Sequence, residues 1–589
     1  MVMESNIAIN SKKALPTSRP EKLWLVPPSA PPEFMAQATA LGLAPLTVQL
    51  LYNRKVDTPE AVDYFFNASY AKLANPMTIK DMDKAVVRVK AALEAGERIA
   101  IYGDFDADGV TGCTLLVQFL RAVGADVIPR IPHRVNDGYG LNRDALKLLA
   151  NSGVKLVITV DCGVSNVAEI AYGRELGLDT IVTDHHRPPD PLPQAVAILN
   201  VRQPGDNYPY KGAAGVGMAF HLARALSQNG LKPKKMTPRD LLDLVALGTV
   251  ADIAPLTGEN RVLVTSGLKA INRSKRPGII ALVEAAGLKP GELDAFSLGF
   301  YLAPRINAAG RIDDATLAYE LLLTEDLERA RQLAEELNQK NKERQNRLGA
   351  VLEEARGRVI AERLDERGKI MILSGEGWPA GVVGLVAGRL CEEFSRPVIV
   401  LEKGEKWCKG SARSTEAFNV VEALSECADL LERFGGHRAA AGLTLACHNL
   451  PELERRLHEL AETRLNQADL VPRLEIDAEL EVSQIPAAFE QSIALSPFGS
   501  ENPAPLFVSR GLLLREARPV GVEGAHLRLK LFDSHQGRMV EAIAFREGSF
   551  AAQLVPGQPL DLVYNIEQGS WQGQKRFEIK VRDFRVSGS

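Results

Sequence analysis

The chain has 589 residues, more than one hydrophobic core can organise, so two to four domains are expected. Hydrophobic residues make up 46% and charged residues 24%, as in ordinary globular proteins, and the net charge of −4 excludes a polycation that coats nucleic acid with its whole surface. The polar, proline-rich start has no secretory h-region and no stretch reaches the roughly 18 to 20 apolar residues of a membrane span, so we expect a cytoplasmic protein without membrane contact.

The first half of the chain predicts an α/β domain. Residues 1–75 are expected to form a polar tail and a small helical lead-in. From 76 to 323, short β-branched runs alternate with amphipathic segments. We expect strands at 97–104, 125–132, 154–161, 179–186 and 195–200, with helices at 109–124, 165–177 and 215–228. Strands that alternate with helices predict βαβ units and therefore a parallel sheet covered by helices.

The second half changes its pattern twice. Residues 324–358 are highly charged with Leu or Ala at helical spacing, which predicts one long connecting helix. A second α/β domain is expected over 359–466, with a helix at 380–394. Within 467–589, apolar and polar residues alternate at every second position between glycine-containing turns, which predicts a small β-barrel.

Three alternating aspartates directly follow the first strand of the α/β domain. Asp104, Asp106 and Asp108 lie between this strand and a helix, so we expect their carboxylates on one side of an extended turn at the carboxyl edge of the sheet. Carboxylates this close repel one another unless a cation neutralises them, and oxygen ligands favour Mg²⁺ or Mn²⁺. The alternatives are a solvated acidic turn or a calcium loop; the calcium loop is disfavoured because Val117 stands where its bidentate Glu belongs.

Other strand ends carry groups of the same kind. Asp161 ends the strand at 154–161, the 179–186 strand ends on Asp184, His185 and His186, and Asp252 closes an apolar helix. Each has an ordinary alternative when taken singly, such as a helix cap or a buried core histidine. Parallel strands bring their carboxyl ends together, so the whole set favours one metal site.

These motifs resemble those of a known superfamily. GDFDADG, VDCG, TDHH and GTVAD occur in the order found in the DHH phosphoesterases. The resemblance implies that two Mn²⁺ or Mg²⁺ ions are held by Asp106, Asp108, Asp161, His185 and Asp252. It also implies that His186 faces the scissile phosphate and that Asp104 is a nearby catalytic or ligand group. Tyr102 stands where the pyrophosphatase-like branch has His, which suits the RecJ branch of exonucleases.

Further stretches are similar to the RecJ branch. They are PHR with DGYGL at 132–141, PRINAAGR at 304–311, KGSARS at 409–414 and GGH at 435–437, the last two resembling a DHHA1 domain. Arginines in glycine-rich loops suit bidentate phosphate binding. The implied substrate-binding residues are Arg134, Arg305, Asn307, Arg311, Ser411, Arg413, Gly435, Gly436 and His437.

The C-terminal strands resemble the OB fold of the same branch. Along the last strand we expect Phe577, Ile579 and Val581 to face the core. Arg576, Lys580 and Arg582 would share the opposite face, with Glu578 among them, which suits single-strand binding, although a basic strand face is more often simply solvated.

The resemblance implies 5′→3′ hydrolysis of single-stranded DNA by two-metal catalysis, in DNA repair and recombination. Two alternatives stay open: a phosphodiesterase for short RNAs or cyclic dinucleotides, and an inactive DNA-binding scaffold. The expected partners are single-stranded DNA, a single-strand-binding protein and a DNA helicase, and a monomer is expected.

Overall fold

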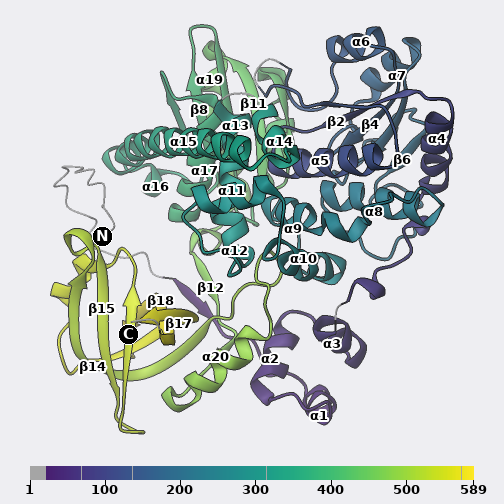
Figure 1. Ribbon diagram of the computed structural model, residues 1–589. Helices are drawn as coiled ribbons and strands as arrows, with labels where there is room; N and C mark the ends of the chain where they lie inside the picture. Colours follow the sequence, from purple (N-terminus) through teal and green to yellow (C-terminus); the bar gives the residue numbers. More distant parts are fainter. Residues whose placement is uncertain (1–21, 68, 135–136, 313–314, 572–573, 589) are drawn as a thin grey trace.

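A computed structural model describes residues 22–67, 69–134, 137–312, 315–571 and 574–588 (Figure 1). Residues 1–21, most of the expected polar tail, lie outside the described part.

The first body is built on a five-stranded, wholly parallel sheet in the order β3-β2-β4-β5-β6. Its strands are β2 (Arg98–Gly103), β3 (Val127–Arg130), β4 (Val154–Val160), β5 (Asp179–Thr183) and β6 (Ala197–Leu199). Its helices are α4 (Met82–Glu94), α5 (Ala107–Ala122), α6 (Arg143–Asn151), α7 (Val167–Glu175), α8 (Gly215–Gln228), α9 (Leu242–Ala251), α10 (Gly258–Ile271), α11 (Pro277–Ala285), α12 (Ala295–Ser297), the π-helix η4 (Leu298–Leu302), α13 (Ala303–Ile312) and α14 (Thr316–Leu323). This confirms the expected parallel sheet. Its strands are buried on both faces, and for this reason they appear in the sequence as continuous apolar runs.

The helix α15 (Leu327–Glu362) joins the first body to the second. It has 36 residues, which corresponds to about 54 Å at the usual helical rise. Leu333 and Leu337 of its first half lie in the core of the first body, and Val351 and Val359 of its second half lie in a core of the second. The helix is therefore a rigid connection with each end fixed in a different core.

The second body has a mixed sheet in the order β10-β11-β9-β8-β7, in which β7 and β8 alone are parallel neighbours. Its strands are β7 (Met371–Gly375), β8 (Val398–Lys403), β9 (Trp407–Arg413), β10 (Leu431–His437) and β11 (Ala440–Ala446). Its main helices are α17 (Ala380–Phe394), α18 (Val420–Ser425) and α19 (Leu450–Arg464).

The C-terminal strands close into a five-stranded barrel, as expected, because β14 pairs with both β15 and β17. The barrel strands are β14 (Phe507–Val520), β15 (His526–Asp533), β16 (Arg538–Ala544), β17 (Pro559–Trp571) and β18 (Gln574–Val586), with the short β13 (Ala478–Glu479) beside β14 and the helix α20 (Ile485–Ile493) next to them. Leu527, Leu529 and Leu531 are buried at alternate positions, as the period of two predicted.

The last strand differs from expectation at Phe577, whereas Lys580 and Arg582 share the face opposite Ile579 and Val581 as expected. Phe577 is 39% exposed and meets the edge of the core through Phe489, whereas Ile579 and Val581 are buried as expected. The expected basic face is largely neutralised: Lys580 Nζ lies 2.5 Å from Glu567 Oε2, and Arg582 Nη2 lies 3.5 Å from Glu567 Oε1. The side chain of Arg576 lies outside the described part. The alternation along a single strand does not show that Glu567 lies opposite on the neighbouring strand β17.

The N-terminal helices pack against this distant barrel. α1 (Pro32–Ala40), α2 (Pro45–Asn53) and α3 (Pro59–Phe66) share one apolar core with it and lie near α20 in Figure 1. The strand β1 (Leu23–Leu25) also pairs with β12 (Arg473–Glu475). The two ends of the described chain therefore form one folding unit.

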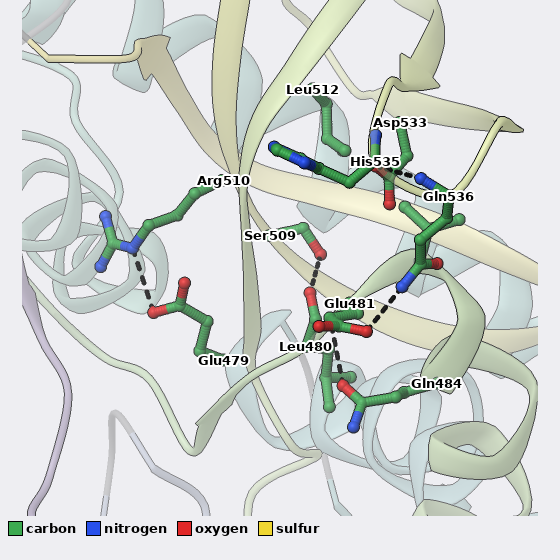
Figure 2. A pocket seen from close by; sticks show the side chains of 11 residues that line it. Glu479, Leu480, Glu481, Gln484, Ser509, Arg510, Leu512, Asp533, His535 and Gln536 are labelled. Carbon is green, nitrogen blue, oxygen red and sulfur yellow. Dashed lines mark hydrogen bonds and ion pairs between the residues drawn. The ribbon is translucent and has the colours of Figure 1, made fainter.

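A hollow of about 480 Å³ opens on the barrel between η8 (Val482–Gln484) and the turn after β15 (Figure 2). Its polar side chains bind one another: Arg510 pairs with Glu479 at 3.1 Å, and Gln536 donates to Glu481 at 2.6 Å. These pairs join the two sides of the hollow and so stabilise the edge of the barrel.

The junction of α2 with the barrel gives a stability prediction. Arg54 and Asp477 form an ion pair at 2.8 Å whose side chains are only 4% and 12% exposed. Arg54→Ala should lower the free energy of unfolding by about 3 to 5 kcal/mol, because it leaves a buried carboxylate without its cation. Arg331→Ala, which breaks an exposed pair with Glu284, should have a much smaller effect. Urea unfolding followed by circular dichroism compares the two; equal losses would contradict a structural role for the buried pair.

Candidate metal centre

The first acidic motif spans the end of β2 and the start of α5. Asp104 directly follows the strand and is buried. Asp106 is the N-cap of α5, and its Oδ1 accepts hydrogen bonds from the amides of Asp108 at 3.0 Å and Gly109 at 3.2 Å. The expected extended turn is therefore wrong, because the chain has already turned into a helix at Ala107.

This turn separates the third aspartate from the other two. Asp108 lies in the first turn of α5, where its carboxylate oxygens accept the amides of Gly215 at 2.6 Å and Val216 at 2.8 Å. These amides begin α8, so Asp108 fixes one helix N-terminus against another. Gly215 is required here, since a Cβ would come within 2.5 Å of Asp161 Cβ.

The other expected ligands converge on the same edge of the sheet. Asp161 follows β4, His185 and His186 follow β5, and Asp252 caps α9. Three groups of residues each bring their possible ligand atoms within 4.8 Å of one another. They are Asp104, Asp106 and Asp161; Asp108, His185 and Asp252; and Asp161, His185 and His186. The topology thus brings all the residues of the expected centre together.

Several buried atoms of this cluster have no hydrogen-bond partner among the described residues: Asp104 Oδ1, Asp161 Oδ1 and His185 Nε2. Asp161 Oδ1 lies 3.0 Å from His185 Nε2, but without hydrogen-bond geometry. Buried polar atoms without partners are costly, so this arrangement favours a bound cation. Carboxylate oxygens with one imidazole suit Mn²⁺ or Mg²⁺, and the donor set fits the expected ions.

The charge state of the cluster supports the same conclusion. Burial, followed by the neighbouring Asp106, raises the pKa of Asp104 well above its usual value. Burial and then the Asp108 carboxylate raise the pKa of Asp252 to about 9. Burial lowers the pKa of His185 to about 3, which keeps its imidazole neutral and able to coordinate a metal. The carboxylates repel one another as long as no cation binds between them.

His186 is oriented by Asp184, expected at the end of the same strand, and by Tyr139 of the DGYGL stretch, neither of which was expected to act on it. Its Nδ1 lies 2.8 Å from Asp184 Oδ1 and 3.1 Å from the Tyr139 hydroxyl, which in turn donates to the backbone oxygen of Asp161 at 3.0 Å. Burial opposes a charge on His186, but the Asp184 hydrogen bond prevails and raises its pKa to about 9. Both residues belong to motifs that the sequence shows, TDHH and DGYGL, but no pattern along the chain indicates that they contact His186.

The GGH strand of the second body reaches this histidine. The ring of His437, at the end of β10, is stacked on His186 with centroids 5.9 Å apart and planes 8° apart. Gly436 has a φ of +149°, and a Cβ there would come within 2.3 Å of the Ala440 oxygen. A Cβ added at Gly435 would meet nothing within 4 Å among the described residues, so a ligand can approach its backbone. The two bodies therefore meet at the metal centre.

The expected phosphate-binding arginines divide into two sets. Arg134, in the loop after β3, lies over the Phe105 ring at 4.1 Å and has a buried Nε without a hydrogen-bond partner among the described residues. Arg311 is close enough to Arg134, Arg413 and Asp106 for each to influence its charge. Burial first, then the neighbouring arginines, lower the pKa of Arg311 to about 9. Arg344 influences Arg311 as well, so several cations share this region and favour a nearby anion.

Arg305 and Asn307 have other contacts. Arg305 and Arg311 lie on helix α13, which corrects the expected loop. Arg305 donates to Asn338 Oδ1 at 3.2 Å and to the Tyr301 oxygen at 2.7 Å, on the side of α15. Asn307 Oδ1 accepts the amide of Ala107 at 2.7 Å, so this side chain positions the start of α5.

Ser411 lies on β9 against α17. A Cβ at Gly384 would come within 3.0 Å of Ser411 Oγ and 3.4 Å of Arg413 Nη2, so these two side chains lie together beside α17. Arg311 also meets the start of α17, where its Nη1 donates to the Gly381 oxygen at 3.4 Å.

A parallel sheet with carboxylates and histidines at its strand ends, facing a GGH strand of a second body, defines a DHH-type metal centre. Residues 98–249 match the DHH family, N-terminal domain, residues 358–463 match the DHHA1 domain, and residues 476–583 match the RecJ OB domain. The chain belongs to the RecJ family.

Similar proteins cover most of the chain. The single-stranded-DNA-specific exonuclease RecJ of Bacillus subtilis (strain 168) is 40% identical over 555 residues, which are 93% of this chain and 69% of that protein. The RecJ of Escherichia coli (strain K12) is 36% identical over 524 residues, 85% of this chain and 90% of that protein. The crystal structure of RecJ in complex with Mn²⁺ from Thermus thermophilus superposes with a TM-score of 0.82 at 33% identity, over 96% of this chain and 80% of that one. RecJ of the same organism is also known in complex with Mg²⁺. Among the described residues, no helix is long and apolar enough to cross a membrane.

Proposed function

We propose that this chain is a metal-dependent exonuclease that hydrolyses single-stranded DNA from its 5′ end. The observation that carries the proposal is the set of buried, unpaired acceptor atoms at the strand ends, next to His186 and its stacked partner His437. The residues that would hold the metals are Asp104, Asp106, Asp108, Asp161, His185 and Asp252. When bound, two divalent ions supply activation of a water molecule and stabilisation of charge on the attacked phosphate.

The chain's own residues bind and orient the phosphate. Asp184 accepts the Nδ1 proton of His186 and leaves Nε2 directed to the substrate, with positive charge on the ring. Arg134, Arg311 and Arg413 bind a terminal 5′ phosphate, whose extra charge an internal phosphodiester lacks. Ser411, Gly435, Gly436 and His437 approach the same strand from the second body.

The direct test follows end-labelled substrates. Single strands labelled at the 5′ or the 3′ end, duplexes and short RNAs are incubated with and without Mn²⁺. We expect Mn²⁺-dependent release of the 5′ label from single-stranded DNA ahead of any shortening at the 3′ end. Preference for RNAs of a few nucleotides would favour a short-RNA phosphodiesterase, and no hydrolysis with any metal would favour a DNA-binding scaffold.

The proposal extends to the setting of the activity. We propose a cytoplasmic monomer that acts in DNA repair and recombination on strands supplied by a helicase and covered by a single-strand-binding protein. Light scattering tests the monomer, and pull-down with purified partners tests the two contacts.

Asp184 gives a prediction for the positioning of His186. Asp184→Asn keeps the size of the side chain but removes the charge that holds the histidine proton at Nδ1. Loss of such a partner behind a functional histidine costs about 10- to 100-fold in activity. kcat at saturating Mn²⁺ should fall by this factor, while Asp144→Asn, on the exposed face of α6, serves as the matched control. An unchanged kcat would mean that Asp184 only supports the loop.

A further inference from the structure

A cleft of about 840 Å³ opens on the first body where α5, α10 and α14 end and α9 and α11 begin. Its floor is an ion pair: Arg276 Nε lies 2.8 Å from Asp243 Oδ2, and the two side chains are only 11% and 6% exposed. Arg276 also donates to Gln118 Oε1 at 2.9 Å and to the Leu322 oxygen at 3.2 Å. The floor is therefore neutral and joins four separate segments of the chain.

The rim above this floor is strongly positive. Residues 232–239 and 269–276 each contain four basic residues and no acidic one, although the whole chain has a net charge of −4. In the part of the chain that the structure describes, none of the exposed cations that line the cleft forms an ion pair with a carboxylate. We call these cations the basic rim; they are Arg239, Lys269, Arg273 and Lys275.

The acidic residues of the cleft do not neutralise the basic rim. Asp240 accepts hydrogen bonds from the amide and the hydroxyl of Thr237 at 2.7 and 2.9 Å. Asp243 is taken up by the floor, and Glu325 is the one other carboxylate among the described lining residues. The cleft therefore keeps an excess of positive charge that an anion can balance.

The cleft and the metal centre lie at opposite ends of the same two helices. α5 begins at its N-cap Asp106, a member of the metal cluster, whereas Gln118 in the cleft lies twelve positions further along. This distance corresponds to about 18 Å at the usual helical rise. α9 runs the other way, from Asp243 in the cleft to Asp252 in the metal cluster. The cleft is therefore a site of its own.

We propose that this cleft binds the phosphate backbone of a nucleic-acid strand that does not enter the metal centre. The inference rests on the proposed function, which brings the protein to DNA, and adds a second contact to it. Cations without carboxylate partners bind a row of phosphates with release of counterions. Two separate basic segments match such a row better than they match a single small anion.

The lining also indicates how this strand is recognised. No aromatic side chain occurs among the described lining residues, so bases have nothing to stack on and the cleft recognises charge alone. A double-stranded region next to the single strand being degraded exposes only its backbone and fits this description. Binding of the duplex at the cleft would keep its single-stranded 5′ tail close to the metal centre.

The first test measures duplex binding without hydrolysis. The ligand is a dumbbell duplex closed by a loop at each end, which has no 5′ terminus, and its affinity is followed by fluorescence anisotropy in EDTA over a range of KCl concentrations. The triple variant Lys269→Gln/Arg273→Gln/Lys275→Gln should bind it about tenfold or more weakly. The slope of log affinity against log salt should flatten by about 2 to 3, because each phosphate contact with a duplex contributes about 0.9.

The matched control removes the same charge elsewhere on the first body. Lys147, Lys155 and Arg174 are exposed on α6, β4 and α7, so Lys147→Gln/Lys155→Gln/Arg174→Gln has the same net charge as the cleft variant. Its affinity for the dumbbell and its salt slope should stay close to those of the unmodified protein. Equal losses in the two triple variants would overturn the cleft, because they would show an effect of net charge only.

The second test measures hydrolysis of a duplex that carries a 5′ single-stranded tail. In the cleft variant, KM for this substrate should rise by about tenfold, since the gain from two linked contacts is lost. KM for the tail alone should stay within about twofold, which also shows that the metal centre is intact.

Competitors identify the ligand class. Inorganic triphosphate and a poly-glutamate peptide are added to the dumbbell complex at equal concentrations of charge, and neither should displace the duplex. Displacement by either one, or unchanged dumbbell binding and salt slope in the cleft variant, would overturn the nucleic-acid backbone as the ligand of the cleft. Absence of nuclease activity in the unmodified protein would instead contradict the proposed function, since the dumbbell measurement needs no hydrolysis.

Discussion

Asp161→Asn should lower hydrolysis of single-stranded DNA by at least about a thousandfold. Asp161 takes part in two of the three ligand groups of the centre and contributes one of its unpaired buried oxygens. A metal site supplies several kcal/mol of transition-state stabilisation, and each 1.36 kcal/mol corresponds to a factor of about ten. Asparagine is the suitable replacement because the φ of Asp161 is +61°, a left-handed conformation that asparagine tolerates and alanine does not. kcat/KM measured over a range of Mn²⁺ concentrations checks the loss.

The same variant should change heat stability in a way that does not depend on activity. Burial, followed by the charges of Asp108 and Asp106, raises the pKa of Asp161 well above its usual value. Its ionised form is therefore less favourable in the folded protein than in the unfolded one, and removing that charge should raise the melting temperature in the absence of metal. The increase in melting temperature on adding Mn²⁺ should shrink, because ligand-linked stabilisation depends on the affinity for the metal.

Asp126→Asn is the matched control for both measurements. Asp126 pairs with Arg98 at the exposed opposite end of the sheet. Its replacement should leave hydrolysis and the Mn²⁺-dependent increase in melting temperature within about twofold of the unmodified protein, as expected for a surface pair. If Asp161→Asn behaved in the same way as this control, the metal centre would have to be placed elsewhere.

Arg311→Ala should selectively reduce activity on strands that carry a 5′ phosphate. Arg311 is half-buried with Arg134, Arg344 and Arg413 close by, so several cations share a region that an anion would stabilise. A charge-assisted hydrogen bond contributes about 1.5 to 3 kcal/mol, which corresponds to a loss of about tenfold or more. A strand with a 5′ hydroxyl already lacks this contact and should be affected less. The ratio of kcat/KM for the two strands is the measurement.

Arg305→Ala, on the same helix α13, separates this effect from a general loss of positive charge. The Arg305 guanidinium contacts Asn338 and the Tyr301 backbone rather than the metal side. The ratio between 5′-phosphorylated and 5′-hydroxyl strands should therefore change by less than about twofold, whatever happens to the absolute rate. Equal ratios in both variants would show that Arg311 binds phosphates generally or serves folding.

Much of this protein could be predicted from local patterns. The helices at 215–228 and 380–394 were predicted with the bounds that the structure shows for α8 and α17. The β-barrel followed from its period-two strands, and the metal centre followed from acidic residues placed after buried strands. These features are decided by neighbours in sequence and by the rule that parallel strands end at a common edge.

The errors came from contacts between segments that are distant in sequence. Lys580 is neutralised by Glu567 on the paired strand, and Phe577 lies at the edge of the barrel core rather than inside it. Arg305 and Arg311 share one motif, but at their spacing on the helix α13 they point to different sides, which the motif does not reveal. No pattern along the chain gives the direction of a side chain relative to a second body.

The sequence by itself determined the parallel sheet, the long connecting helix, the barrel and the residue types of the metal centre, because hydrophobic period and strand-end chemistry are local properties. Only the tertiary structure decided that α1–α3 share a core with the barrel and that His437 stacks on His186. Each of these contacts joins segments that are far apart in the sequence. Which segments meet depends on the shapes of the folded surfaces and not on spacing along the chain.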